Sequence, residues 1–158
     1  MPARAAFPRR RLVWTVAAPL VVGAAFYVLF RPHEAHFVSW LGSIATPIGL
    51  AIRATRSVTV PIGTHIPSVV LDVAPDLAWA VALGSLLAIV WRKESRRVAT
   101  YWFAAGALCS IGYELGQRWH LVPGTFDPLD LAAQTVGYVA GWWLGSRGYG
   151  QLRSSASP

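Results

Sequence analysis

Residues 113–145 read YELGQRWHLVPGTFDPLDLAAQTVGYVAGWWLG. This stretch joins the end of one apolar run, a compact polar turn and the whole of the next apolar run. The Pro-Gly pair at 123–124 is a strong turn signal, and Asp127, Pro128 and Asp130 match the N-cap, N1 and N3 positions of a new helix. The stretch therefore predicts a helical hairpin whose second helix begins near Asp127.

The second helix of this hairpin carries a regular row of glycines. Gly137, Gly141 and Gly145 recur every four residues and so share one face of the helix. Small residues at this spacing let helix backbones approach closely in lipid. We expect this face to be a seam for packing against another helix.

The composition indicates a membrane protein. Of 158 residues, 54% are hydrophobic and 13% are charged, which is too apolar for an ordinary soluble domain. The net charge of +7 does not indicate nucleic-acid binding, because the basic residues lie between apolar runs rather than on one surface. Cys109 is the single cysteine, which excludes an intrachain disulfide and a cysteine-cluster metal site.

The apolar runs predict a single all-α membrane domain, residues 1–158. The first run follows an arginine-rich start, and its length and lack of a cleavage site favour an uncleaved anchor over a signal peptide. Pro75 and Asp76 suit the first turn of the second span. The domain consists of four spans at about 12–30, 77–91, 98–116 and 128–144, an extracytoplasmic segment 31–76, and short tails 1–11 and 146–158.

The segment 31–76 is predicted to lie near the outer membrane surface. Apolar residues recur at helical spacing from Phe37 to Ile52, which favours an interfacial helix broken or bent at Pro47. The alternation of Val58, Val60 and Ile62 weakly indicates a short extended piece.

The charges predict the orientation. Ten of the fourteen basic residues lie before the first span, between the second and third, or after the fourth, and the positive-inside rule makes this side cytoplasmic. Both termini are therefore expected in the cytoplasm. Six of the seven acidic residues fall on the other side.

The outer ends of the spans gather polar residues at a similar depth. Carboxylates near hydrocarbon face a bundle interior, pair with another group, or mark function. Glu114 and Asp130 are the candidate catalytic or binding pair, and Gln117 shares a helix face with Glu114. The predicted binding site consists of Asp76, Glu114, Gln117, Asp127 and Asp130.

Structural roles compete with this functional interpretation. Asp127 fits a helix cap, and Asp76 can complement a helix N-terminus. Glu114 could pair with Arg118 one turn away, or could bind the exposed N–H groups that begin the fourth helix. The second arrangement would make Glu114 a staple for the hairpin, and a staple and a functional site can coexist.

Metal, cofactor and common catalytic motifs are not evident. His33 and His36 are three apart, so they do not form the His-Glu-x-x-His zinc motif. Carboxylate oxygens suit magnesium or calcium, but no spacing here is diagnostic of either ion. We predict no cofactor and no metal, and the sequence contains no Gly-x-Ser-x-Gly, phosphate loop or dinucleotide fingerprint.

The hairpin motifs resemble those of the VanZ-like family of small bacterial membrane proteins. The likeness is closest over Ala74 to Gly145. Many members carry arginine where Thr125 stands and asparagine where Gln134 stands, so the chain resembles a divergent branch. The motifs are Pro75-Asp-Leu-Ala-Trp-Ala80, Glu114-x-x-Gln117, Gly124-Thr-Phe-Asp127-x-x-Asp130 and Gln134-x-x-Gly137-x-x-x-Gly141.

The resemblance implies a multi-pass protein of the bacterial cytoplasmic (inner) membrane, and some members are linked to low-level glycopeptide resistance. We expect a non-enzymatic cell-envelope protein that binds or excludes an amphiphilic or lipid-linked molecule at an outward-facing polar groove. Membrane lipids are then the expected partners. The first alternative is a structural or accessory subunit that packs among other subunits of a membrane complex. The second is an acid–base enzyme acting on an envelope lipid, with Glu114 as the acid and Asp130 ionised.

Overall fold

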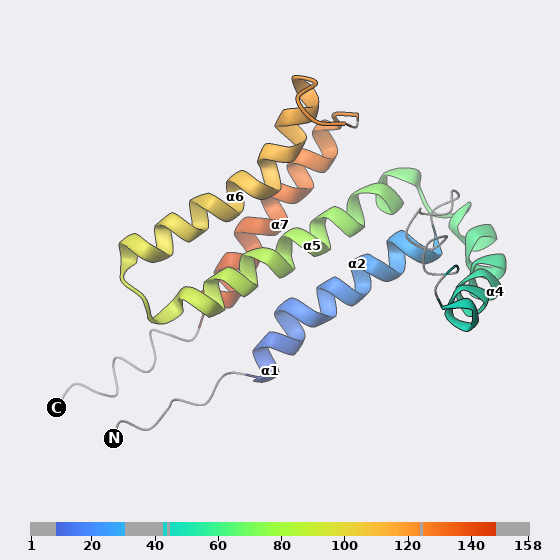
Figure 1. The fold of residues 1–158 in the computed structure, drawn as a ribbon, viewed down its shortest axis with the longest axis horizontal. Coiled ribbons are helices and arrows are strands. Elements are labelled where there is room, and N and C mark those ends of the chain that lie inside the picture. Colours follow the sequence, from blue (N-terminus) through green and yellow to red (C-terminus); the bar gives the residue numbers. More distant parts are fainter. Residues whose placement is uncertain (1–8, 31–42, 44, 124, 148–158) are drawn as a thin grey trace.

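The computed structural model describes residues 9–30, 43, 45–123 and 125–147. Within these residues the fold is all-α, and α5 runs through the middle of the helices (Figure 1). The elements are α1 (Arg9–Leu12), the π-helical turn η1 (Val13–Ala17), α2 (Ala18–Leu29), α4 (Thr46–Gly63), α5 (Ser68–Val90), the 3₁₀ turn η2 (Trp91–Lys93), α6 (Arg96–Arg118) and α7 (Pro128–Ser146).

Two helices of the described chain are long and apolar enough to cross a membrane. They are Arg9–Leu29, which joins α1, η1 and α2, and Ser68–Lys93, which joins α5 and η2. The remaining two predicted spans correspond to α6 and α7, which have 23 and 19 residues but are not as apolar. The arginines at both ends of α6, together with Glu114 and Gln117, lower its apolarity.

The start of α5 corrects one prediction. We expected a second span of 77–91 with Pro75 in its first turn, but the helix begins at Ser68 and contains Pro75 in its interior. Apolar residues continue the helix before Pro75, and the proline ring is fully buried. A proline inside an apolar helix is tolerated where neighbouring helices pack around it. The 23 residues of α5 exceed the about 20 that a span needs.

The glycines of α7 lie against the backbone of α5. A Cβ atom added at Gly137 would come within 2.6 Å of the Leu77 carbonyl oxygen, and one added at Gly145 within 2.6 Å of the Ser85 carbonyl oxygen. Gly141, between them, meets the backbone of Val81. The residue numbers of the contacting positions increase along both helices in the same direction, so α5 and α7 run parallel.

The helix α5 also contributes small residues to this interface with α7. Gly84 lies against the α7 backbone at Tyr138, and Ala80 and Ala88 are each 3% exposed one turn before and after it. The hydroxyl of Ser85 donates a hydrogen bond of 2.9 Å to the Gly141 carbonyl oxygen. Close backbone approach therefore depends on small residues in both helices.

The turn between α6 and α7 contains the helix start that the sequence predicts. The N-cap of α7 is Asp127, whose Oδ1 accepts a 2.8 Å hydrogen bond from the Leu129 N–H, and Pro128 is the first helical residue. The preceding helix ends through His120, which has a φ of 57°. The Leu121 N–H donates to the Gly116 carbonyl oxygen at 2.8 Å, so the chain reverses three residues before the Pro-Gly pair.

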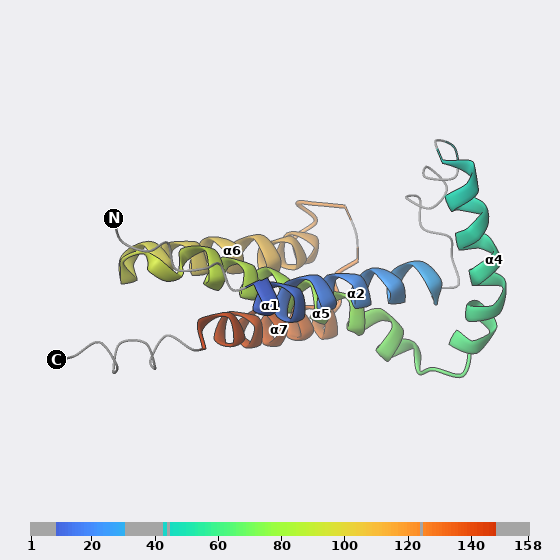
Figure 2. The ribbon, with the colours of Figure 1, turned by 90° about the horizontal axis from the view of Figure 1, so that it is seen from below.

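The helix α4 corrects one further prediction. It begins at Thr46 with Pro47 in its first turn. Ala45, just before it, is not helical, which agrees with a break in the helix next to Pro47. The helix α4 continues to Gly63, so the extended piece expected at Val58 to Ile62 is wrong and these residues are helical. Residues 37–42 and 44 of the expected interfacial helix lie outside the described residues. Figure 2 shows α4 running across the ends of α2 and α5 rather than along these helices.

Candidate functional site

The predicted acidic site lies between the end of α6 and the first turns of α7. Glu114 is 6% exposed, and its Oε1 accepts a hydrogen bond of 3.3 Å from Nε2 of Gln134. Oε1 of Gln134 in turn lies 3.5 Å from the Ser110 hydroxyl, which donates to it. These contacts connect the two helices through buried or half-buried polar groups.

The carboxylate of Glu114 also faces the start of α7. It interacts with the backbone N–H of Asp127, and the carboxylates of Asp127 and Asp130 are close enough to repel it. Gln117 is buried on the same face of α6, and its amide is placed best with the nitrogen toward Glu114 Oε2 (3.3 Å) and the Thr125 carbonyl oxygen (2.9 Å). This arrangement is the one expected if Glu114 is a staple that holds α6 to the start of α7. Ligand binding or catalysis by these residues stays a prediction.

Asp76 is carried by a different helix from the other four predicted residues. It is half-buried on α5, next to Leu77, whose carbonyl oxygen lies against Gly137 of α7. Asp76 therefore lies on α5, whereas the other four predicted residues lie on α6, on α7 or at the turn between them. Sequence reasoning did not assign Gln134 or Ser110 a role, although both lie at helical spacing from predicted residues.

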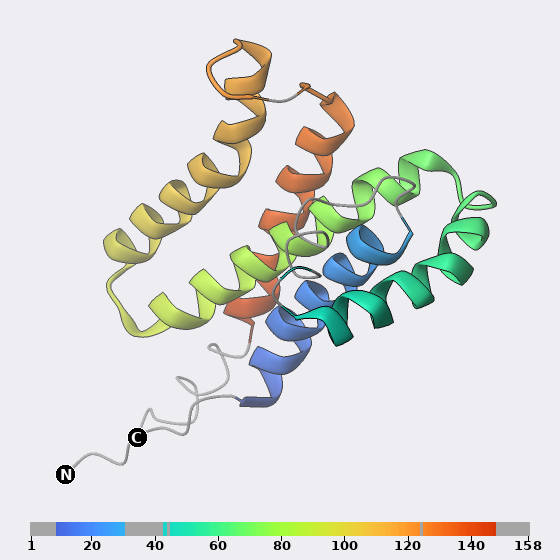
Figure 3. The same ribbon diagram turned by 45° about the vertical axis from the view of Figure 1, so that its right-hand side comes forward.

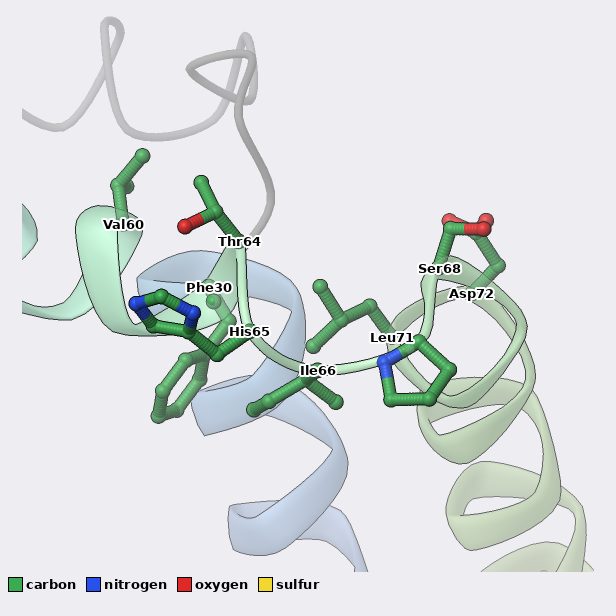
Figure 4. A pocket seen from close by; sticks show the side chains of 10 residues that line it. Phe30, Val60, Thr64, His65, Ile66, Ser68, Leu71 and Asp72 are labelled. Atoms are coloured by element: carbon green, nitrogen blue, oxygen red, sulfur yellow. The ribbon is translucent and has the colours of Figure 1, made fainter.

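A cavity of about 600 Å³ lies near the same end of the helices, between the end of α2, the end of α4 and the start of α5 (Figure 4). None of the five residues predicted to bind a ligand lines it. Phe30, Val60, Ile66 and Leu71 supply apolar walls, while polar groups come from the turn and from α5. The lining residues are Phe30, Val60, Gly63, Thr64, His65, Ile66, Pro67, Ser68, Leu71 and Asp72.

The helix α4 is attached to α2 beside this cavity. Arg56 is 8% exposed, and its guanidinium donates a hydrogen bond to the Val28 carbonyl oxygen. The Thr59 hydroxyl donates to the Leu29 carbonyl oxygen at 2.5 Å. Carbonyls in the last turn of a helix have no partner within the helix, and a cation there is favoured by the helix dipole. Arg56 and Thr59 thus fix the wall formed by α4, a role that sequence reasoning did not identify.

Among the residues that the structure describes, no group of three histidine, cysteine or acidic side chains is arranged to hold a metal ion. His33 and His36 lie outside the described residues.

The fold defines an all-α protein with helices of membrane-spanning length and apolarity. Comparison with protein families places it further: the VanZ/LLP1 family model matches residues 19–147, and the chain belongs to this family of membrane proteins. The resemblance noted in the hairpin motifs is therefore confirmed. No match was found among curated proteins or among solved structures.

Proposed function

We propose that this protein is a non-enzymatic cell-envelope protein of the bacterial inner membrane, and that it binds an amphiphilic or lipid-linked molecule in the cavity between α2, α4 and α5. The mixed lining of this cavity carries the proposal. Phe30, Val60, Ile66 and Leu71 can pack against an apolar chain, while Thr64, His65, Ser68 and Asp72 can bind its polar end.

The position of the cavity supports the same ligand class. If α5 enters from the outer face, its first turns lie at the depth of lipid headgroups, and α4 lies across this surface. Several large apolar residues of α4 are exposed, as expected of a helix in an interface. These residues are Ile48, Leu50, Val58 and Ile62.

The proposed topology has four spans. Two are the helices that pass the length and apolarity test, and α6 and α7 are the other two. The parallel course of α5 and α7 fits two spans that both enter from the outside, with α6 returning between them. Reporter domains fused after Arg153 and inserted within residues 64–72 are expected on opposite sides of the membrane. Finding both reporters on one side would exclude this topology.

The cavity can be tested by filling it. Thr64→Trp places a large side chain among the lining residues, and we expect it to lower retention of a lipid-linked or lipoglycopeptide probe by about tenfold. Altered lipoglycopeptide tolerance in a susceptible bacterium should be lost with it. Thr55→Trp is the matched control, because Thr55 is exposed on α4, the helix that Thr64 directly follows, and both hydroxyls donate a hydrogen bond to a backbone carbonyl oxygen of α4. Equal effects of the two changes, or no effect of either, would contradict the proposal.

The alternative, a structural subunit, predicts different behaviour for the same wild-type protein. Large exposed apolar side chains on α6, such as Tyr101 and Leu108, suit either lipid or a neighbouring subunit. A fixed stoichiometry with other membrane proteins after gentle extraction would favour the subunit. Isolation with lipid alone would favour the envelope-binding proposal.

A further inference from the structure

A second, larger cavity lies at the opposite end of the helices. It measures about 1170 Å³ and is bounded by the end of α5, by η2, by the start of α6 and by the end of α7. Figure 3 shows α6 and α7 diverging toward this end from their shared turn. The lining residues are Ala88, Trp91, Arg92, Lys93, Glu94, Arg96, Ala99, Thr100, Phe103, Val139, Trp142, Trp143 and Ser146.

The charged groups of this cavity are mostly cationic. Arg92, Lys93 and Arg96 line it together with one acid, Glu94. Lys93 and Arg96 are exposed. Three cations against one carboxylate give this cavity a net positive charge, which favours a ligand that carries negative charge.

Most of the remaining lining of the cavity is apolar, and its aromatic side chains are packed against other rings. Trp91 stacks on Trp102 with ring centroids 4.6 Å apart, and Phe103 packs edge-to-face against Trp142 at 4.9 Å. Ala99 and Val139 add apolar surface between these rings and the charged rim. Such a surface fits an acyl chain, and tryptophans are typical of the headgroup region of a membrane.

We propose that this cavity binds an anionic glycerophospholipid of the leaflet at the basic end of the helices. The phosphate lies at Lys93 and Arg96, and an acyl chain lies along Ala99, Phe103 and Val139. The positive-inside rule assigns this end to the cytoplasmic leaflet, where juxtamembrane basic residues attract anionic lipids. This site is separate from the outward cavity, so either can exist without the other.

Native mass spectrometry of the full chain in mild detergent tests the headgroup. Phosphatidylglycerol is expected to remain bound more than phosphatidylcholine. Lys93→Gln with Arg96→Gln should weaken phosphatidylglycerol binding by about 25-fold, or about fivefold for each cation, and should weaken binding of the zwitterionic phosphatidylcholine less. Both residues are exposed, so we expect the variant to fold, and circular dichroism checks this.

The matched control is Arg10→Gln with Arg97→Gln. Both arginines are exposed near the same end, but neither lines the cavity, and the loss of charge is the same. Equal weakening by the two double variants would show attraction to general surface charge and overturn the proposal. Equal binding of the two lipids by the wild-type protein would also overturn it.

A second pair of variants tests the acyl chain. Ala99→Trp should fill the cavity and abolish phosphatidylglycerol retention, whereas Ala104→Trp, at an exposed position of α6 outside the cavity, should not. An excess of inorganic phosphate should leave the lipid bound. Retention by Ala99→Trp, or displacement by phosphate alone, would exclude a site that holds the whole lipid.

Discussion

Gly141→Ala is expected to destabilise the protein by about 1–3 kcal/mol, because the added methyl group has no room between α5 and α7. The methyl group would overlap the carbonyl oxygen, carbonyl carbon and Cα of Val81. All three are backbone atoms, so no side-chain rotation relieves the clash. The helices must move apart, and the hydrogen bond from Ser85 to the Gly141 carbonyl oxygen would lengthen or break. Reversible unfolding in mixed micelles measures the change.

Gly112→Ala is the control for this experiment. It makes the same substitution inside α6, where the nearest atom to the added Cβ would be Leu108 Cδ1 at an ordinary 3.5 Å. Alanine is favoured over glycine within a helix by roughly 0.5–1 kcal/mol, so this variant is expected to be neutral or slightly more stable. A stability loss for Gly112→Ala that equals the loss for Gly141→Ala would mean that the seam is not responsible.

The seam also shows which parts of the fold the sequence could predict. The spacing of Gly137, Gly141 and Gly145 indicates a packing face, because a helix places every fourth residue on one side. It does not identify the partner. The matching row in α5, formed by Ala80, Gly84 and Ala88, has the same spacing and could have identified it. The helix start at Asp127 and Pro128 could be predicted, because a helix cap depends only on residues that are close in sequence.

The errors arose where tertiary contacts outweigh local preference. Pro75 is typical of a first helical turn, yet burial among neighbouring helices allows it inside α5. The alternation of Val58, Val60 and Ile62 covers too few residues to separate a strand from a helix. The cavity between α2, α4 and α5 could not be predicted at all, since it forms where the ends of α2 and α4 meet the start of α5.

Substitutions of Glu114 in the acidic cluster can distinguish a structural role of its carboxylate from a functional one. Glu114→Leu removes the acceptor for the Gln134 amide and for the Asp127 N–H, and leaving buried donors without partners costs about 1–3 kcal/mol. Glu114→Gln retains an acceptor oxygen, so we expect it to fold with nearly wild-type stability. Glu94→Leu, which removes an exposed acid at the other end, should change the stability by less than about 0.5 kcal/mol.

The same variants decide whether the cluster catalyses a reaction. Acid–base chemistry needs carboxyl groups that exchange protons, which neither Glu114→Gln nor Asp130→Asn can provide. If the cluster is only a staple, both variants fold and alter lipoglycopeptide tolerance as the wild-type protein does, and this is the result we expect. A variant that folds normally but loses this effect would show that its carboxylate acts on a ligand or substrate. The stability measurement on Glu114→Leu distinguishes that outcome from misfolding, because a staple predicts loss of stability for leucine and its retention for glutamine.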